Sequence, residues 1–133
     1  MMINQKSNNF WALSLRPEYW QEIKDGEKHH EFRRRGYVVE TGTVFVVYVT
    51  RPVKAVCGLF MAGEVIIGEP RKTLESLGYE YSDYWDGCPS GTVIEIKEYR
   101  AIEPRSVWFR PPLGLIRLSY VPDDIRCALM PSE

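Results

Sequence analysis

The sequence predicts an α+β fold in which a small β-barrel carries two short flanking helices. Short runs of β-branched and aromatic residues recur along the chain, whereas only two segments combine helical spacing with start and stop signals. Gly58 and Gly63 interrupt the longest apolar run, as happens where a strand bends while a small sheet closes on itself. At 133 residues the chain has the size of one domain. We expect that domain to cover residues 10–122, with polar termini at 1–9 and 123–133, the second of them a mobile tail.

The expected strands are short and are bounded by glycine, proline or polar residues. The run that ends at Thr50 is rich in valine and aromatic residues, which is typical of a fully buried strand. Thr92, Ile94 and Ile96 fall on one face of the run that contains them, the pattern of a half-exposed strand. The expected strands are 10–15, 28–34, 41–50, 53–67, 92–99 and, as a candidate last strand, 113–120.

Two segments are predicted to be helices. In 17–25 a proline suits the first helical position, Trp20 and Ile23 fall on one face, and Gly26 follows as a stop. In 69–78 a proline stands near the start, two leucines are spaced i, i+3, and a glycine ends the segment. These are the two helices expected beside the barrel.

The composition excludes proteins that bind nucleic acid through overall charge. Hydrophobic residues make up 44% of the chain and charged residues 26%, as in ordinary folded proteins, and the net charge is -1. Residues 1–60 carry nine Lys/Arg against six Asp/Glu, whereas the remainder carries eight against twelve. An anion-binding site must therefore be local, and the first part of the chain is the place to look for it.

Cysteine spacing and hydropathy indicate a cytoplasmic protein without a cofactor. Cys57, Cys88 and Cys127 form no disulfide or metal-binding pattern, and His29 and His30 are adjacent and so point apart in a strand. We expect reduced thiols, no metal and no organic cofactor. No apolar run approaches the roughly 18 residues of a membrane span, and the first residues lack a signal-like apolar segment, so we expect no membrane partner.

The segment "DGEKHHEFRRR" concentrates charge directly after the first predicted helix. In a strand, Glu31 and Arg33 project to one face, while Lys28 beside the preceding turn can lie at the mouth of a cleft. A lysine partly removed from water is a usable base or nucleophile, and Glu31 could orient it. The alternative is structural: Glu31 and Arg33 form an ion pair that holds the barrel, and Lys28 is merely solvated.

The stretch "LSLRPEYWQEIKDGEKHHEFRRR" resembles the ASCH domain, a family of PUA-like β-barrels. The family's Gly-x-Lys-x-x-Glu-x-Arg pattern is met by Gly26, Lys28, Glu31 and Arg33. Three further segments resemble the family in the same order, and the likeness covers roughly residues 11–120. These segments are "YVTRPVKAVCGLF", "YWDGCPSGTVIEI" and "FRPPL".

The resemblance implies a function connected with RNA. Some small family members are amidohydrolases that remove the acetyl group from acetylcytidine with a lysine, a threonine three residues later and a glutamate. Lys28 matches the lysine, Glu31 stands where the threonine would be, and Glu75 is a candidate for the glutamate without a convincing local match. Because a carboxylate adds the wrong charge beside a developing oxyanion, the substitution weakens the transfer of this activity. Other relatives are regulatory adaptors that bind protein partners.

Further candidate ligand-binding residues lie at strand ends and in the aromatic loop. Tyr84 and Trp85 could stack an unpaired base, or they could cover the end of the barrel. Arg16 and Arg51 lie at strand ends, where loops often form binding sites, although a solvated arginine is the common alternative. Thr50 could bind a ligand or cap the backbone. The leading hypothesis is a cationic cleft that binds RNA or a modified nucleoside through these residues, Lys28 and Arg33, with Lys28 and Glu31 as catalytic candidates. The alternatives are an amidohydrolase that uses Lys28 and a protein-binding adaptor.

Overall fold

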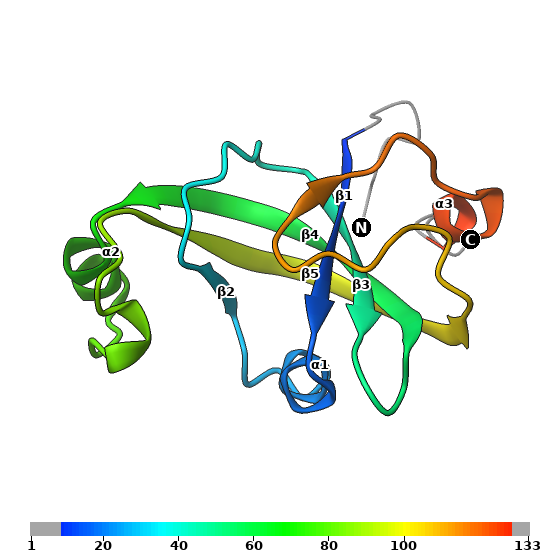
Figure 1. Cartoon of the computed structure of the whole chain (residues 1–133), viewed down its shortest axis with the longest axis horizontal. Coiled ribbons are helices and arrows are strands. Elements are labelled where there is room, and N and C mark those ends of the chain that lie inside the picture. Colours follow the sequence, from blue (N-terminus) through cyan, green and yellow to red (C-terminus); the bar gives the residue numbers. More distant parts are fainter. Residues whose placement is uncertain (1–8, 129–133) are drawn as a thin grey trace.

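The computed structural model describes residues 9–128 and confirms a small α+β barrel. Six strands form one curled sheet, in which β4 and β5 make a long ribbon with α2 at one end (Figure 1). The strand order is β2-β5-β4-β3-β1-β6. The bounds are β1 Phe10–Leu15, β2 His30–Arg33, β3 Val44–Val49, β4 Ala55–Gly68, β5 Gly91–Arg105 and β6 Ile116–Arg117.

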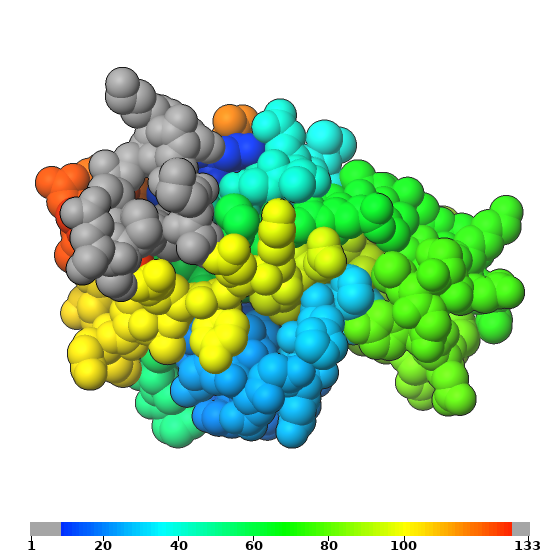
Figure 2. All heavy atoms as spheres, turned by 180° about the vertical axis from the view of Figure 1, so that it is seen from behind, coloured from blue at the N-terminus to red at the C-terminus, as the bar shows by residue number. Residues whose placement is uncertain are grey.

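The two predicted helices are present as α1, Pro17–Lys24, and α2, Pro70–Leu77. A single 3-10 turn, η1, covers Asp83–Trp85. Seen from behind, the segment around α2 projects from the rest of the molecule (Figure 2). Within residues 9–128, no helix has both the length and the apolar character needed to cross a membrane.

Residues 123–127 differ from the expected mobile tail, because they form a third helix, α3, Asp123–Cys127. Its Ile125 is only 1% exposed and belongs to the same cluster as Phe10, Val46 and Leu59. One apolar side chain among polar neighbours is enough to dock this short helix, and the polar composition of the segment concealed it. The domain limits 10–122 stay a prediction, and residues 1–8 and 129–133 lie outside the described part of the chain.

β1 pairs with β3 in parallel, while the other neighbouring strands are antiparallel. Leu15 is opposite Val49, and the Thr50 amide donates to the Leu15 carbonyl at 2.9 Å. Because parallel strands end at the same edge of a sheet, Arg16 and Thr50 emerge side by side. This pairing is what assembles one wall of the site described below.

The glycines in β4 mark irregular pairing, as predicted from the sequence. The β4–β5 register shifts between Val56 and Gly58 and again around Gly63, between Ala62 and Val65. A Cβ on Gly58 would collide with the Trp20 ring, and one on Gly63 would collide with the Glu95 carboxylate. The two glycines therefore permit close approach where the long ribbon bends.

Two strands differ in length from their predictions. β5 continues to Arg105, well past the expected end at residue 99, because it stays paired with β4 as far as Val56. β6 contains only two residues, where 113–120 had been considered a strand. Pro111 and Pro112 directly precede this segment and have no backbone N–H to donate to a neighbouring strand, which limits pairing at its start.

The core has a cluster on each face of the sheet. One fills the inside of the curl, where Leu13, Phe45 and Phe60 meet Trp20 and Ile23 of α1. The other lies on the opposite face of β1, β3 and β4 and is covered by α3. β1 serves both clusters, because successive side chains alternate between its two faces.

Candidate functional site

A pocket of about 580 Å³ lies where β1 and β3 end and β2 passes. We call it the barrel-mouth pocket. It brings together five of the residues predicted from the sequence, although they come from four separate segments of the chain. These residues are Arg16, Glu31, Arg33, Thr50 and Tyr84.

The centre of the pocket wall is a buried carboxylate held between two cations. Glu31 is 5% exposed, with Lys28 Nζ 3.4 Å from Oε1 and Arg33 Nη2 3.0 Å from Oε2. The Phe32 backbone amide also donates to Oε1 at 3.0 Å. One acid against two bases leaves the group positive, and the exposed Arg16 adds a further cation at the pocket.

Arg33 also joins the two sides of the incompletely closed barrel. Its Nη2 donates to the Ser14 carbonyl on β1 at 3.2 Å, although β2 and β1 are not neighbours in the sheet. The Arg33 Nε is buried and has no hydrogen-bond partner among residues 9–128. The ion pair foreseen as the structural alternative is therefore present, and it forms part of the pocket wall at the same time.

Lys28 lies behind this wall and does not line the barrel-mouth pocket. Its Nζ is 5.5 Å from the centre of the Tyr19 ring and 5.2 Å from that of Phe32. Its side chain is 13% exposed and borders a separate pocket of about 270 Å³ with His30 and Tyr79. Lys28 is thus neither a freely solvated lysine nor one whose amine opens directly into the barrel mouth.

His30 in that smaller pocket has a lowered pKa. Burial is the main cause, and the charges of His29 and Lys28 lower it further, while Glu95 and Glu64 oppose the shift. Its Nδ1 lies 2.6 Å from the Tyr79 hydroxyl. The neutral ring is therefore favoured in the folded protein.

Tyr84 and Trp85 are adjacent in the chain but take different places. Tyr84 is 46% exposed and lines the pocket. Its hydroxyl donates a hydrogen bond to the Phe32 carbonyl at 3.1 Å, and partial burial raises its pKa. Trp85 is 4% exposed and packs with Leu74 and Val93. A Cβ on Gly91 would overlap the Trp85 ring, so that glycine makes room for the indole. Of the two proposed stacking residues, the structure thus brings only Tyr84 to the pocket.

Two other candidates lie away from the pocket lining. Arg51 is exposed in the turn after Thr50 and does not border the pocket, although its neighbour does. Glu75 is exposed on α2 and is absent from the pocket lining as well.

Three aromatic residues of the pocket were not identified from the sequence. Tyr19 comes from α1, Tyr48 from the run predicted to be a fully buried strand, and Phe32 from β2 between Glu31 and Arg33. The β3–β4 register shifts between Val47 and Tyr48, and this irregularity lies where the side chain comes to the pocket. The hydroxyl-bearing Tyr48 near the end of an otherwise apolar strand was the available signal.

Comparison with known proteins places these features in a family. No protein-family model matches the sequence. An ASCH domain-containing ribonuclease of Zymomonas mobilis is 30% identical over 100 residues, which cover 70% of this chain and 68% of that protein. The chain belongs to the ASCH domain family.

Solved structures agree with this assignment. The crystal structure of ASCH from Zymomonas mobilis superposes with a TM-score of 0.73 at 25% identity, covering 92% of this chain and 94% of that one. A serine-to-alanine variant of the Zymomonas protein gives a TM-score of 0.72 at 27% identity, covering 84% and 89% of the two chains. The resemblance inferred from the Gly-x-Lys-x-x-Glu-x-Arg pattern is confirmed.

Proposed function

We propose that this protein binds single-stranded RNA in the barrel-mouth pocket. The observation that carries the proposal is the meeting of Arg16, Arg33 and three tyrosines around a carboxylate that is already neutralised. A pocket of about 580 Å³ lies within the usual range for small-ligand sites and could receive a nucleotide. The Zymomonas relative, which is named as a ribonuclease, supports RNA as the ligand.

Each part of the pocket would contact a different part of a nucleotide. Tyr84 and Tyr48 offer ring surfaces, and stacking of an unpaired base contributes about 1 to 3 kcal/mol. Arg16 is exposed and could pair with a phosphate, whereas Arg33 is largely committed to Glu31 and Ser14. Thr50 at the strand end could donate to or accept from the ribose 2′-hydroxyl, the group that distinguishes RNA from DNA.

RNA cleavage is the second candidate, favoured by the ribonuclease relative. Attack of a 2′-hydroxyl on the adjacent phosphate forms a 2′,3′-cyclic phosphate and breaks the bond from phosphorus to the 5′-oxygen of the next nucleotide. The step requires a base to accept the 2′-hydroxyl proton, cations to stabilise the added negative charge, and a proton from water for the departing 5′-oxygen. Glu31 on the pocket wall would be the base, and the nearby guanidinium groups of Arg16 and Arg33 would supply the cations. Under this proposal, a Glu31→Gln protein that is shown by circular dichroism to be folded forms no 2′,3′-cyclic phosphate ends but retains binding.

The other two hypotheses remain open to direct tests. An amidohydrolase would release cytidine from acetylcytidine, and Lys28→Ala would abolish that release, because Lys28 Nζ is the amine next to Glu31. An adaptor would retain a protein partner after nuclease treatment, and Arg16→Ala would not change its affinity for that partner. Neither outcome is expected if RNA is the ligand of the pocket.

The test is fluorescence anisotropy with a labelled RNA 8-mer at several salt concentrations. Tyr84→Ala should weaken binding by about 5-fold to 150-fold, the equivalent of one lost stacking interaction. Arg16→Ala should reduce the slope of log affinity against log salt by about 0.7, the value for one phosphate contact on a single strand. Lys72→Ala on the distant α2 removes the same charge and should change neither quantity. Affinity that is independent of salt, or that is unaffected by both pocket substitutions, would contradict the proposal.

A further inference from the structure

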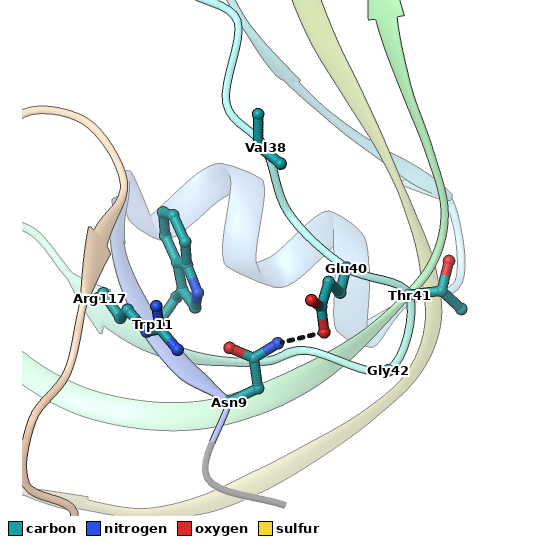
Figure 3. Close-up of a pocket in the computed structure, with 7 residues that line it drawn as sticks. All are labelled: Asn9, Trp11, Val38, Glu40, Thr41, Gly42 and Arg117. Carbon is teal, nitrogen blue, oxygen red and sulfur yellow. Dashed lines mark hydrogen bonds between the residues drawn. The ribbon is translucent and has the colours of Figure 1, made fainter.

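A second pocket of about 530 Å³ lies at the other end of β1 and contains side chains suited to a nucleotide (Figure 3). We call it the Trp11 pocket. Trp11 projects from β1, and Val38 and Glu40 come from the coil segment that runs beside it (Figure 3). Asn9 and Arg117 complete the parts of the lining used below.

The Trp11 pocket combines a flat ring, an acid and a cation. Trp11 is half-buried, with its ring centre 6.4 Å from that of Phe45 behind it, so the indole is supported from within while it borders the pocket. Glu40 is exposed and accepts a hydrogen bond from Asn9 Nδ2 at 3.3 Å. Arg117 is exposed on β6 directly opposite Trp11 in register, and it forms no ion pair with any residue in the range 9–128.

We propose that the Trp11 pocket is a second nucleotide subsite, which holds a base with an exocyclic amino group from the same RNA strand. The base stacks on Trp11, its amino group donates to the Glu40 carboxylate, and Arg117 pairs with an adjacent phosphate. This inference rests on the proposed binding of RNA at the barrel mouth.

The distance between the two pockets suits a short single strand. β1 runs from one to the other, and the four residue steps from Trp11 to Leu15 span about 13 Å. A stacked strand that rises about 3.4 Å per nucleotide covers this span with roughly four nucleotides. A stacked RNA shorter than this does not reach both pockets at once.

Each of the two pockets has an exposed apolar side chain in its lining. Val38 lines the Trp11 pocket and is 86% exposed, and Leu113 lines the barrel-mouth pocket and is fully exposed. Their chain neighbours Tyr37 and Gly114 are in contact, because a Cβ on Gly114 would strike the Tyr37 hydroxyl. The two segments that carry Val38 and Leu113 therefore meet, and under this proposal the strand passes over them, with apolar surface available to its bases.

The test compares an RNA 8-mer with a 3-mer of the same composition. For the wild-type protein we expect the 8-mer to bind at least about tenfold more tightly, because only it gains a second stacking interaction. Trp11→Ala should remove most of this length advantage, Trp11→Phe should retain part of it, and Lys72→Ala should leave it intact. Arg117→Ala should lower the salt slope of the 8-mer by about 0.7.

Base identity gives a second readout that does not depend on altering Trp11. Oligo(C) should bind more tightly than oligo(U), which has no amino group, and Glu40→Gln should narrow the difference. Circular dichroism melting of each variant identifies any that fails to fold.

The outcomes separate the two proposals. If Tyr84→Ala weakens the 8-mer but folded Trp11→Ala and Arg117→Ala proteins keep the wild-type length advantage and salt slope, the second subsite is rejected and the first stands. If the 8-mer shows no salt-dependent binding at all, both are rejected.

Discussion

The two ends of β1 use similar charged residues in opposite ways. At the barrel mouth, Glu31 is buried between Lys28 and Arg33, and the cluster also holds β2 to β1. At the other end, Glu40 and Arg117 are exposed, and the acid has only an amide partner among the described residues. The charged residues at the barrel mouth therefore stabilise the fold as well as line a pocket. The charged residues at the far end can contact a ligand, and their substitution should change the stability of the fold very little.

The largest expected effect comes from removing the buried acid. Glu31→Ala leaves two partly buried cations without their counterion, and it should lower the free energy of unfolding by about 3 to 5 kcal/mol. Glu40→Ala is the same change at the exposed end and should stay within about 0.5 kcal/mol of wild type. Urea unfolding of both variants measures the contrast. Equal losses would refute the distinction drawn between the two ends.

The next largest effect concerns the wall behind the mouth. In Gly91→Ala the new Cβ meets the Trp85 ring and approaches the Arg33 carbonyl at 2.9 Å, so we expect a loss of about 1 to 3 kcal/mol in unfolding free energy. Gly68 is directly opposite on β4 and is the matched control, because its added Cβ makes only an ordinary contact with Thr73. A Gly68→Ala protein as unstable as Gly91→Ala would show that Trp85 packing is not the cause.

A smaller effect should follow from changing the guanidinium that bridges the barrel. Arg33→Lys keeps the charge but cannot reproduce the guanidinium geometry that reaches both Glu31 and the Ser14 carbonyl, so we expect a loss of about 1.5 kcal/mol. Arg117→Lys at the exposed end should have no measurable effect on unfolding. Thermal and urea unfolding of the two variants measure the difference in unfolding free energy. An Arg33→Lys protein that is as stable as the wild type would contradict the bridging role of Arg33.

The smallest expected effect is a pH dependence of the unfolding free energy that is caused by His30, in the smaller pocket beside Lys28. Because burial lowers the His30 pKa below 6.5 in the folded state, the unfolded chain takes up the proton first as the pH falls. The free energy of unfolding should therefore decline as the pH falls from 7 through 6.5 toward the lower folded pKa. His30→Gln should flatten this decline and leave the curve above pH 7 unchanged in slope. Parallel curves for the two proteins from pH 7 downward would count against the role of His30.

Local chemistry predicted much of this architecture. Apolar runs rich in aromatic or β-branched residues located β1, β3 and β4, and proline and glycine signals located both main helices. The parallel pairing of β1 with β3 was not predicted, because it joins strands that are separated in sequence by a helix and another strand. That pairing is also what places Arg16 beside Thr50.

The candidate site was predictable in its charge and less so in its aromatic residues. The alternation in β2 correctly placed Glu31 and Arg33 on one wall. Composition could not decide which neighbour of the Tyr84–Trp85 pair faces outward, because that depends on the space left by Gly91 on another strand. For the same reason, the local pattern could not show that Lys28 packs between two rings behind the pocket.

The most direct measurement is a map of backbone amide chemical shifts during titration with an RNA 8-mer. Binding at the barrel mouth predicts the largest early shifts at Arg16, Thr50 and Tyr84 and in the strand from Glu31 to Arg33, with α2 unaffected. Shifts that are confined to surfaces away from these residues, while the RNA binds with full affinity, would contradict the central claim.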